Sequence, residues 1–187
     1  MPIAEASKAK GFEVVIGYGE LGGVDPKFLE DKGFKVKHIP IERGQISPLK
    51  DLISLYYIWN FFKEERPNIV HLVTIKPYLY GGIIARLTGV SCLVSAVSGL
   101  GSLFIAKNLR SRFLRLILYP FFKMAFGHIN QKIILQNKDD SKVLEDWGVL
   151  NSFKVKLIKG SGVKLENFNF DNNEPAGIPT ICFAARL

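Results

Sequence analysis

The sequence has few cysteines. Only two of its 187 residues are cysteine, Cys92 and Cys182, and both lie in apolar runs. They are interpreted as small buried side chains, so a disulfide scaffold is excluded and a reducing compartment is permitted. With 48% hydrophobic and 22% charged residues, the composition also excludes a disordered or collagen-like chain. The length predicts one domain, or one domain and part of another.

Acidic residues are missing from the middle of the chain. No aspartate or glutamate occurs between Arg66 and Lys138, although that stretch carries ten lysines and arginines. The segments on either side have nearly balanced charges. Because the net charge of +8 is concentrated in this way, the sequence favours an anionic partner: lipid headgroups, a diphosphate or nucleic acid. The alternative is a basic protein whose charge has no such role.

Several catalytic motifs are also missing. No Cys and His residues have metal-ligand spacing, so we expect no metal site. No Gly-Lys-Ser/Thr and no Gly-x-Ser-x-Gly is present, which excludes a Walker loop and a hydrolase elbow. The acid-free stretch argues against a two-carboxylate glycosidase site.

One charge-free window, residues 87–106, is long enough to span a bilayer. Its glycines and serines instead predict a helix end, a buried strand and a turn. Residues 1–10 lack the apolar core of a signal peptide. We therefore expect neither a membrane span nor a secretory leader.

Helix and strand signals alternate along the chain. We expect helices at residues 2–10, 26–32, 48–65, 78–87, 109–126 and 138–147, strands at residues 13–18, 35–39, 69–73, 92–97, 132–135 and 155–158, and a loop at residues 74–77. This alternation predicts an α/β fold with a doubly wound, mostly parallel sheet. The chain opens on a helix, so we expect the first, central strand of that sheet to be missing.

The end of the sequence differs in character from the rest. Residues 167–179 are polar, contain two prolines and are predicted to form a linker. Residues 180–185 are apolar and predict one more strand. We therefore assign residues 1–166 to one domain, and residues 180–187 to the first strand of a second domain that is cut short.

The predicted helix at residues 109–126 has two distinct faces, and its axis is expected to bend at Pro120. A basic stripe and the apolar residues beside it comprise Arg112, Arg115, Tyr119 and Lys123, with Leu116, Phe122 and Phe126. The opposite face is expected to meet the core and comprises Phe113, Ile117, Phe121 and Met124. Cations bordered by aromatic side chains predict an interfacial helix on anionic lipid, and a solvated basic face is the alternative.

Candidate ligand-binding residues follow three predicted strands. Glycines let the backbone approach a phosphate or sugar, and open α/β sheets bind ligands at the carboxyl ends of their strands. A plain turn is the alternative for each glycine-rich run. The candidates are Lys76, then Ser98, Gly99 and Gly101, and then Gly160, Ser161 and Gly162.

These motifs together resemble the N-terminal half of a bacterial GT-B glycosyltransferase of family 4. The similarity is to the branch that builds capsule, O-antigen and lipid-linked oligosaccharides. It rests on residues 1–6 (MPIAEA), 67–77 (PNIVHLVTIKP), 80–86 (YGGIIAR), 97–101 (VSGLG), 136–137 (QN), 160–163 (GSGV) and 184–187 (AARL), which run in family order.

The resemblance implies two Rossmann-like domains facing across a cleft. The N-terminal domain would bind the acceptor, and the C-terminal domain a nucleotide-sugar. Such enzymes retain the anomeric configuration and need no metal or other cofactor. Acceptors in this branch are lipid-pyrophosphate-linked sugars, which implies a cytoplasmic protein held peripherally on the inner face of the cell membrane. The family's first strand and the carboxylate motif of its donor domain have no counterpart here.

The resemblance also implies roles for the candidate residues. Lys76 and the basic helix, through Arg112 and Arg115, would hold the acceptor diphosphate. We expect Lys76 to contact the acceptor rather than the core, because no acid lies near it in the sequence. The cleft would be lined by Ser98, Gly99 and Gly101, and the donor side by Gly160, Ser161, Gly162 and Arg186. Ser98 is a weak catalytic candidate, since many relatives have a histidine there.

Other functions remain open. The chain is expected to be inactive and marginally stable alone, so it could be a truncated gene product or a non-catalytic, membrane-associated accessory subunit. A nucleic-acid binder is a further alternative. The basic stretch has no aromatic platform for single strands and no known nucleic-acid motif, so we expect no nucleic-acid partner.

Overall fold

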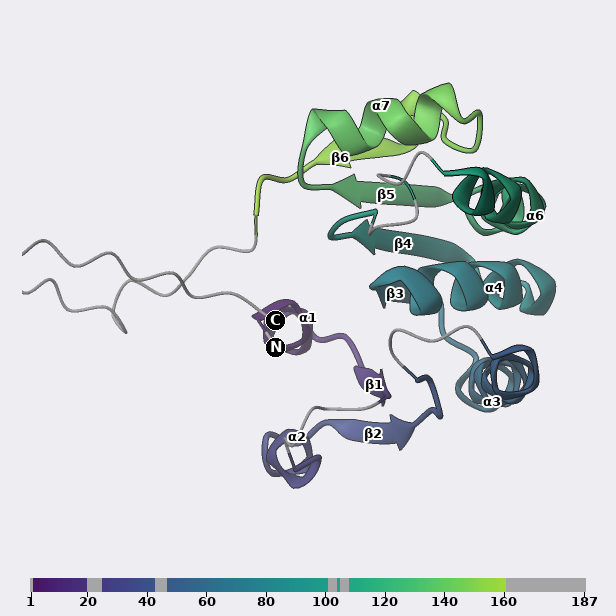
Figure 1. The fold of residues 1–187 in the computed structure, drawn as a ribbon. Coiled ribbons are helices and arrows are strands. Elements are labelled where there is room, and N and C mark those ends of the chain that lie inside the picture. The colour runs from purple at the N-terminus through teal and green to yellow at the C-terminus, as the bar shows by residue number, and fades with distance from the viewer. Residues whose placement is uncertain (1, 20–24, 43–46, 101–103, 105–107, 161–187) are drawn as a thin grey trace, which may run out of the picture.

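The structure is a computed structural model and describes residues 2–19, 25–42, 47–100, 104 and 108–160. Helices and strands alternate in the predicted order (Figure 1). They are α1 (Pro2–Ala9), β1 (Val15–Tyr18), α2 (Lys27–Asp31), β2 (Lys35–His38), α3 (Pro48–Glu65), β3 (Ile69–Val73), α4 (Gly82–Thr88), β4 (Cys92–Val97), α6 (Leu109–Ala125), β5 (Gln131–Leu135), α7 (Lys138–Asp146) and β6 (Val155–Leu157). The bounds of α3, β3 and β4 agree with the predicted ones.

All strand pairs are parallel, which confirms the predicted fold class. One sheet has the order β3-β4-β5-β6, and β1 pairs with β2 in a second sheet of two strands. Within the described residues no strand joins β1 to β3. The absence of a first, central strand stays a prediction.

Helix α3 connects the two sheets. Lys35 and Lys37 of β2 form ion pairs with Glu65 and Glu64 at the end of α3, at 2.7 and 3.0 Å. On its other side α3 packs against α4. The buried residues Ile58 and Phe62 of α3 belong to the same core cluster as Ile39, which follows β2. The small sheet is therefore attached to the larger one through the packing of α3.

Helices α3, α4 and α6 form one layer, with α4 between the other two (Figure 1). The contact between α4 and α6 depends on a glycine. A Cβ added at Gly82 would lie 2.8 Å from the carbonyl oxygen of Ala125. Because backbone cannot yield as a flexible side chain can, any larger residue at Gly82 would push α4 and α6 apart.

The structure overturns the prediction about which face of α6 is buried. Phe122 and Phe126 are 1% and 2% exposed, although we expected them beside an exposed basic stripe. Phe122 contacts the rings of Tyr78, Phe104 and Trp147. The expected core face is instead exposed, at 65% for Phe113, 46% for Ile117, 48% for Phe121 and 36% for Met124. The helix has apolar residues on more than one of its faces, so hydrophobic periodicity alone selected the wrong one as the buried face.

A second correction concerns residues 74–77, which we predicted to form a loop. Helical structure already starts at Ile75 and continues through a π-helical turn, Pro77–Gly81, into α4. Proline is tolerated there because the first turn of a helix leaves its N–H groups without intrahelical partners. In the parts of the chain that the structure describes, no helix combines the length and the apolar character needed to cross a membrane.

Candidate functional site

The carboxyl ends of the four strands of the larger sheet meet at one edge. The register aligns Val73 with Ala96, Val97 with Leu135, and Leu135 with Leu157. Residues that follow these strands, among them Lys76, Ser98 and Gly160, therefore lie along the same edge. The register thus confirms the predicted position of these candidates at one edge of the sheet. Open α/β sheets bind ligands at this edge.

Lys76 does not stand free at this edge. Its Nζ lies 2.7 Å from Oδ1 of Asp51, in the first turn of α3, and the two side chains are only 17% and 13% exposed. The other carboxylate oxygen of Asp51 accepts a hydrogen bond from the N–H of Ser47, at 3.1 Å. No acid lies near Lys76 in the sequence, but folding brings one in from 25 positions away. A contact of Lys76 with the acceptor stays a prediction.

Tyr80 lies next to this ion pair. Burial, and then the negative charge of Asp51, raise the pKa of the Tyr80 hydroxyl. Tyr80 therefore stays neutral and keeps its proton across the physiological range. Sequence analysis singled out neither Asp51 nor Tyr80. For Asp51 the available signal was its position four residues after the helix-starting Ser47, which suits a carboxylate that bonds to the helix N-terminus.

The next two strands end in different ways. Ser98 is exposed and Gly99 is half-buried after β4, whereas Gly101 lies outside the described residues. After β5 the side chain of Asn137 accepts a hydrogen bond from the N–H of Asp140, at 2.7 Å, and so caps α7. The Ser98 hydroxyl is thus the accessible side-chain oxygen that follows β4 directly, and it remains a candidate for orienting a substrate.

The basic stripe of α6 is divided between two roles. Arg112 is exposed, and Arg115 is half-buried, with its guanidinium 3.5 Å from the carbonyl oxygen of Phe104. Lys123 donates a hydrogen bond to the carbonyl oxygen of Gly148, at 2.5 Å. Arg115 and Lys123 therefore help to hold α6 in place. Arg112, together with the exposed Arg110 beside it, is left to attract an anion from solution.

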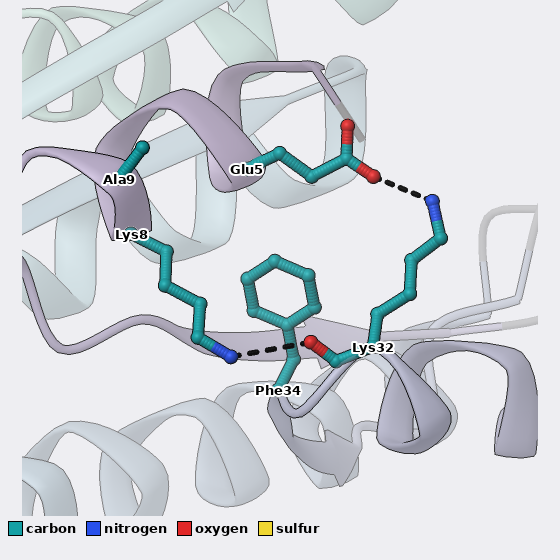
Figure 2. Close-up of a pocket in the computed structure, with 5 residues that line it drawn as sticks. All are labelled: Glu5, Lys8, Ala9, Lys32 and Phe34. Atoms are coloured by element: carbon teal, nitrogen blue, oxygen red, sulfur yellow. Dashed lines mark hydrogen bonds and ion pairs between the residues drawn. The ribbon is translucent and has the colours of Figure 1, made fainter.

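A hollow between α1 and the start of β2 is lined by two lysines, and both are bound to other groups of the protein (Figure 2). Lys32 forms an ion pair with Glu5, at 2.5 Å. Lys8 donates to the carbonyl oxygens of Lys32 and Gly33, and its ammonium lies 5.1 Å from the centre of the Phe34 ring. These contacts tie α1 to the loop before β2, so we interpret the hollow as structural.

Of the four predicted donor residues, only Gly160 belongs to the described part of the chain. Gly160 is described and is exposed, with a φ of 70° in the left-handed region that favours glycine. Ser161, Gly162 and Arg186 fall outside it, as do the predicted linker at residues 167–179 and the predicted strand at residues 180–187.

The Lys76–Asp51 pair yields a test of its structural role. We expect Lys76→Met to lower the free energy of unfolding by about 1–3 kcal/mol, because it leaves a largely buried carboxylate without its partner. Asp51→Asn should do the same, and the double variant should lose less than the sum, as coupled residues do. Urea denaturation measures all three.

The control for this test is an exposed ion pair. Lys142 and Asp146 are 75% and 64% exposed, so Lys142→Met should cost at most about 0.5 kcal/mol. Two results would show that Lys76 is free for another role. One is a double variant whose loss of unfolding free energy equals the sum of the two single losses, and the other is a Lys76→Met variant as stable as the Lys142→Met control.

Comparisons with known proteins agree with this architecture. Residues 1–137 match the family described as "Glycosyl transferase 4-like". Over 138 residues the chain is 27% identical to an Escherichia coli UDP-Gal:alpha-D-GlcNAc-diphosphoundecaprenol alpha-1,3-galactosyltransferase. Its fold is similar to that of MurG from Acinetobacter baumannii, with a TM-score of 0.52 and 14% identity.

The chain is shorter than both proteins. The match to the galactosyltransferase takes in 74% of this chain and 34% of the relative. The match to MurG takes in 88% of this chain and 41% of that structure. The matched family region, residues 1–137, includes the ends of β3, β4 and β5, and with them most of the candidate edge.

Proposed function

Because the chain belongs to the glycosyl transferase 4-like family, we propose that it is the acceptor-side part of a sugar-transferring enzyme. The donor would be a nucleotide-sugar, the acceptor a saccharide linked through a diphosphate to a lipid, and the pathway the synthesis of a surface polysaccharide. The name of the galactosyltransferase relative, which specifies a UDP-sugar and a lipid-diphosphate acceptor, supports both substrate classes.

One observation carries this proposal: the edge formed by the strand ends belongs to a stretch of sequence that is basic and contains no acidic residue. The carboxyl ends of β3, β4 and β5 lie within the stretch from Arg66 to Lys138, which has ten basic residues and no acid. The acid that folding brings to this edge, Asp51, is paired with Lys76. Two phosphates of an acceptor would therefore meet little net repulsion there and the charge-assisted donors of the exposed Arg110 and Arg112. Arg112 would bind them, and Ser98 with the backbone at Gly99 would orient the saccharide.

The chemical step would depend on the donor side. In the proposed reaction the sugar leaves a nucleotide diphosphate and joins an acceptor hydroxyl, with retention of configuration and without a metal. Positive charge and backbone N–H groups near Gly160, Ser161, Gly162 and Arg186 would stabilise the departing diphosphate. Because the match spans only 34% of the galactosyltransferase relative, we expect the 187-residue chain to bind acceptor but to transfer no sugar by itself.

We also propose that the protein works at the cytoplasmic face of the cell membrane, where a lipid-linked acceptor would be found. The exposed face of α6 supports this. It is apolar along its whole length and comprises Leu109, Phe113, Leu116, Ile117, Phe121 and Met124. Arg110 and Arg112 border it and are exposed. An apolar stripe with cations beside it is typical of a helix lying in the surface of an anionic bilayer.

The proposal is tested by titrating the full chain with a short-chain polyprenyl diphosphate that carries N-acetylglucosamine. We expect saturable binding that weakens about tenfold in Arg112→Gln, the loss expected for one charge-assisted hydrogen bond. Lys10→Gln, at an exposed lysine of the α1 end, is the matched charge control and should bind normally. The prenyl diphosphate without sugar should bind more weakly.

Sugar transfer is measured in parallel with labelled nucleotide-sugars. Absence of acceptor binding would refute the proposed function. Transfer by the chain alone would refute the division into acceptor and donor parts. Acceptor binding without transfer, even when a donor-binding domain is supplied, would favour a non-catalytic accessory subunit or an inactive product.

A further inference from the structure

Thr74, which follows β3 directly, has a backbone conformation that its side chain disfavours. Its φ is 74°, in the left-handed region that glycine adopts freely. A β-branched residue is an outlier there, because the two heavy atoms on its Cβ crowd the backbone. Such strain persists only where the surrounding structure imposes it, and it is concentrated at sites that bind ligands.

The structure on both sides of Thr74 imposes the turn. Before it lies the paired strand β3, and after it a helical segment begins at the next residue. The carbonyl oxygen of Thr74 accepts a hydrogen bond from the N–H of Tyr78, at 3.0 Å. A Cβ added at Gly81 would lie 2.7 Å from a methyl carbon of Leu72, so the helical segment packs closely onto β3. The chain must therefore turn sharply at Thr74, and a positive φ provides the turn.

This turn explains the conformation but not the type of residue, since a glycine would make it without strain. Among the residues that the structure describes, the other positive φ values belong to six glycines and to Arg66. Arg66 is unbranched and ends α3, with its N–H bonded to the carbonyl oxygen of Phe62, which is a common way for a helix to end. Thr74 instead precedes a helix, where an extended residue is usual.

The Thr74 side chain is available to a ligand. Thr74 is exposed, and its hydroxyl has no hydrogen-bond partner within the described part of the chain. Thr88 shows the structural alternative, because its hydroxyl donates to the carbonyl oxygen of Ile84 at 2.8 Å. Thr74 has no such bond, so its hydroxyl does not explain the strained turn through a contact within the protein.

A second exposed hydroxyl follows the adjacent strand. The pairing of Val73 with Ala96 places Thr74 and Ser98 just after neighbouring strand ends, and adjacent strands are about 4.8 Å apart. A hydroxyl group both donates and accepts hydrogen bonds, as the hydroxyls of a sugar do. Two neutral hydroxyls at this edge therefore match a saccharide, whereas the exposed arginines of α6 match a diphosphate.

We infer that Thr74 is a specificity-determining residue of the candidate edge, and that its hydroxyl binds a hydroxyl group of the acceptor saccharide beside Ser98. The inference rests on the proposed function, to which it adds a residue that recognises the sugar rather than the diphosphate. The sheet before Thr74 and the helix after it fix its backbone. The saccharide therefore meets a hydroxyl group that is already positioned, without ordering of the backbone on binding.

The test titrates variants of the full chain with two ligands, a short-chain polyprenyl diphosphate that carries N-acetylglucosamine and the same prenyl diphosphate without sugar. Thr74→Val keeps the branched side chain and removes the hydroxyl, Thr74→Gly removes both, and Thr74→Ser keeps the hydroxyl. Arg66→Gly is the matched control, because it replaces the left-handed residue that precedes the opposite end of β3.

Thr74→Val and Thr74→Gly should bind the sugar-bearing ligand about fivefold more weakly, the loss expected for one hydrogen bond between neutral groups. Their affinity for the prenyl diphosphate without sugar should equal that of the wild type. Thr74→Ser and Arg66→Gly should bind both ligands as the wild type does.

Thermal unfolding separates this role from a structural one. Thr74→Gly should raise the melting temperature by about 2–4 °C because it relieves the strain, whereas Thr74→Val keeps the strain and should leave the melting temperature unchanged. Thr74→Gly would then be more stable than the wild type and yet bind the saccharide more weakly. A threonine with a structural role would not produce this combination.

Normal binding of the sugar-bearing ligand by Thr74→Val, with the expected defect in Arg112→Gln, would overturn this inference and leave the proposed function intact. An equal loss of affinity for both ligands would also overturn it, because Thr74 would then not distinguish the sugar from the diphosphate. A lower melting temperature of Thr74→Gly would overturn it by assigning the residue a structural role. Failure of the wild-type chain to bind either ligand would refute the proposed function itself, and this inference with it.

Discussion

Replacing Phe113, Leu116 and Ile117 of α6 together with glutamine is expected to weaken binding to anionic vesicles about 100-fold. These side chains are 65%, 71% and 46% exposed in the structure, so they are available to enter the headgroup region. Complete burial of one such side chain contributes about 1.5–3 kcal/mol, and partial insertion of three gives about 3 kcal/mol in total. Vesicle co-sedimentation over a range of lipid concentrations measures the loss.

The dependence on salt separates the apolar contribution from the electrostatic one. Arg110→Gln with Arg112→Gln should weaken binding at low salt by about 1 kcal/mol for each base, and this difference should shrink as salt is added. The defect of the apolar variant should persist at high salt. An apolar variant that binds as well as the wild type at every salt concentration would contradict the assignment of α6 to the membrane.

Two neighbouring phenylalanines of α6 should differ sharply in their effect on stability. Phe122→Ala is expected to lower the free energy of unfolding by about 3–5 kcal/mol, because it removes a ring that is 1% exposed and leaves a cavity among aromatic side chains. Phe121→Ala removes the same number of atoms from a side chain that is 48% exposed, so it should cost less than about 1 kcal/mol. Urea denaturation monitored by circular dichroism gives both values.

The Phe121→Ala and Phe122→Ala variants serve as controls for each other in a test of how α6 is oriented. Both variants lose the same aromatic group at adjacent positions, so effects on helix propensity nearly cancel in the comparison. A larger loss for Phe121→Ala than for Phe122→Ala would mean that α6 is rotated and that the face assigned to the membrane belongs to the core.

The order and type of the elements followed from local signals. Ser47-Pro48 starts α3 and Pro67 prevents its continuation, and both are recognisable without any tertiary information. Alternation of helices with strands was enough to predict parallel sheets, because a parallel connection needs a crossover of the length that these helices provide. The same topology placed Lys76, Ser98 and Gly160 along one edge.

The buried face of α6 depended on contacts between distant segments. Leu118, Phe122 and Ala125 share one side of the helix, while Phe113, Ile117 and Phe121 share another, and both sides are apolar. Hydrophobic periodicity cannot choose between two apolar faces. The choice depends on the close approach of Gly82 to Ala125 and on the rings of Tyr78 and Trp147 around Phe122.

The sequence by itself determined the α/β class, the bounds of α3, β3 and β4, and the gathering of the candidate residues at one edge, because these depend on local propensity and on the topology of parallel strands. Only the tertiary structure decided that Lys76 is paired with Asp51 and that α6 exposes Phe113 rather than Phe122. An ion pair and a buried face are properties of two surfaces in contact, and each surface is encoded far from the other along the chain.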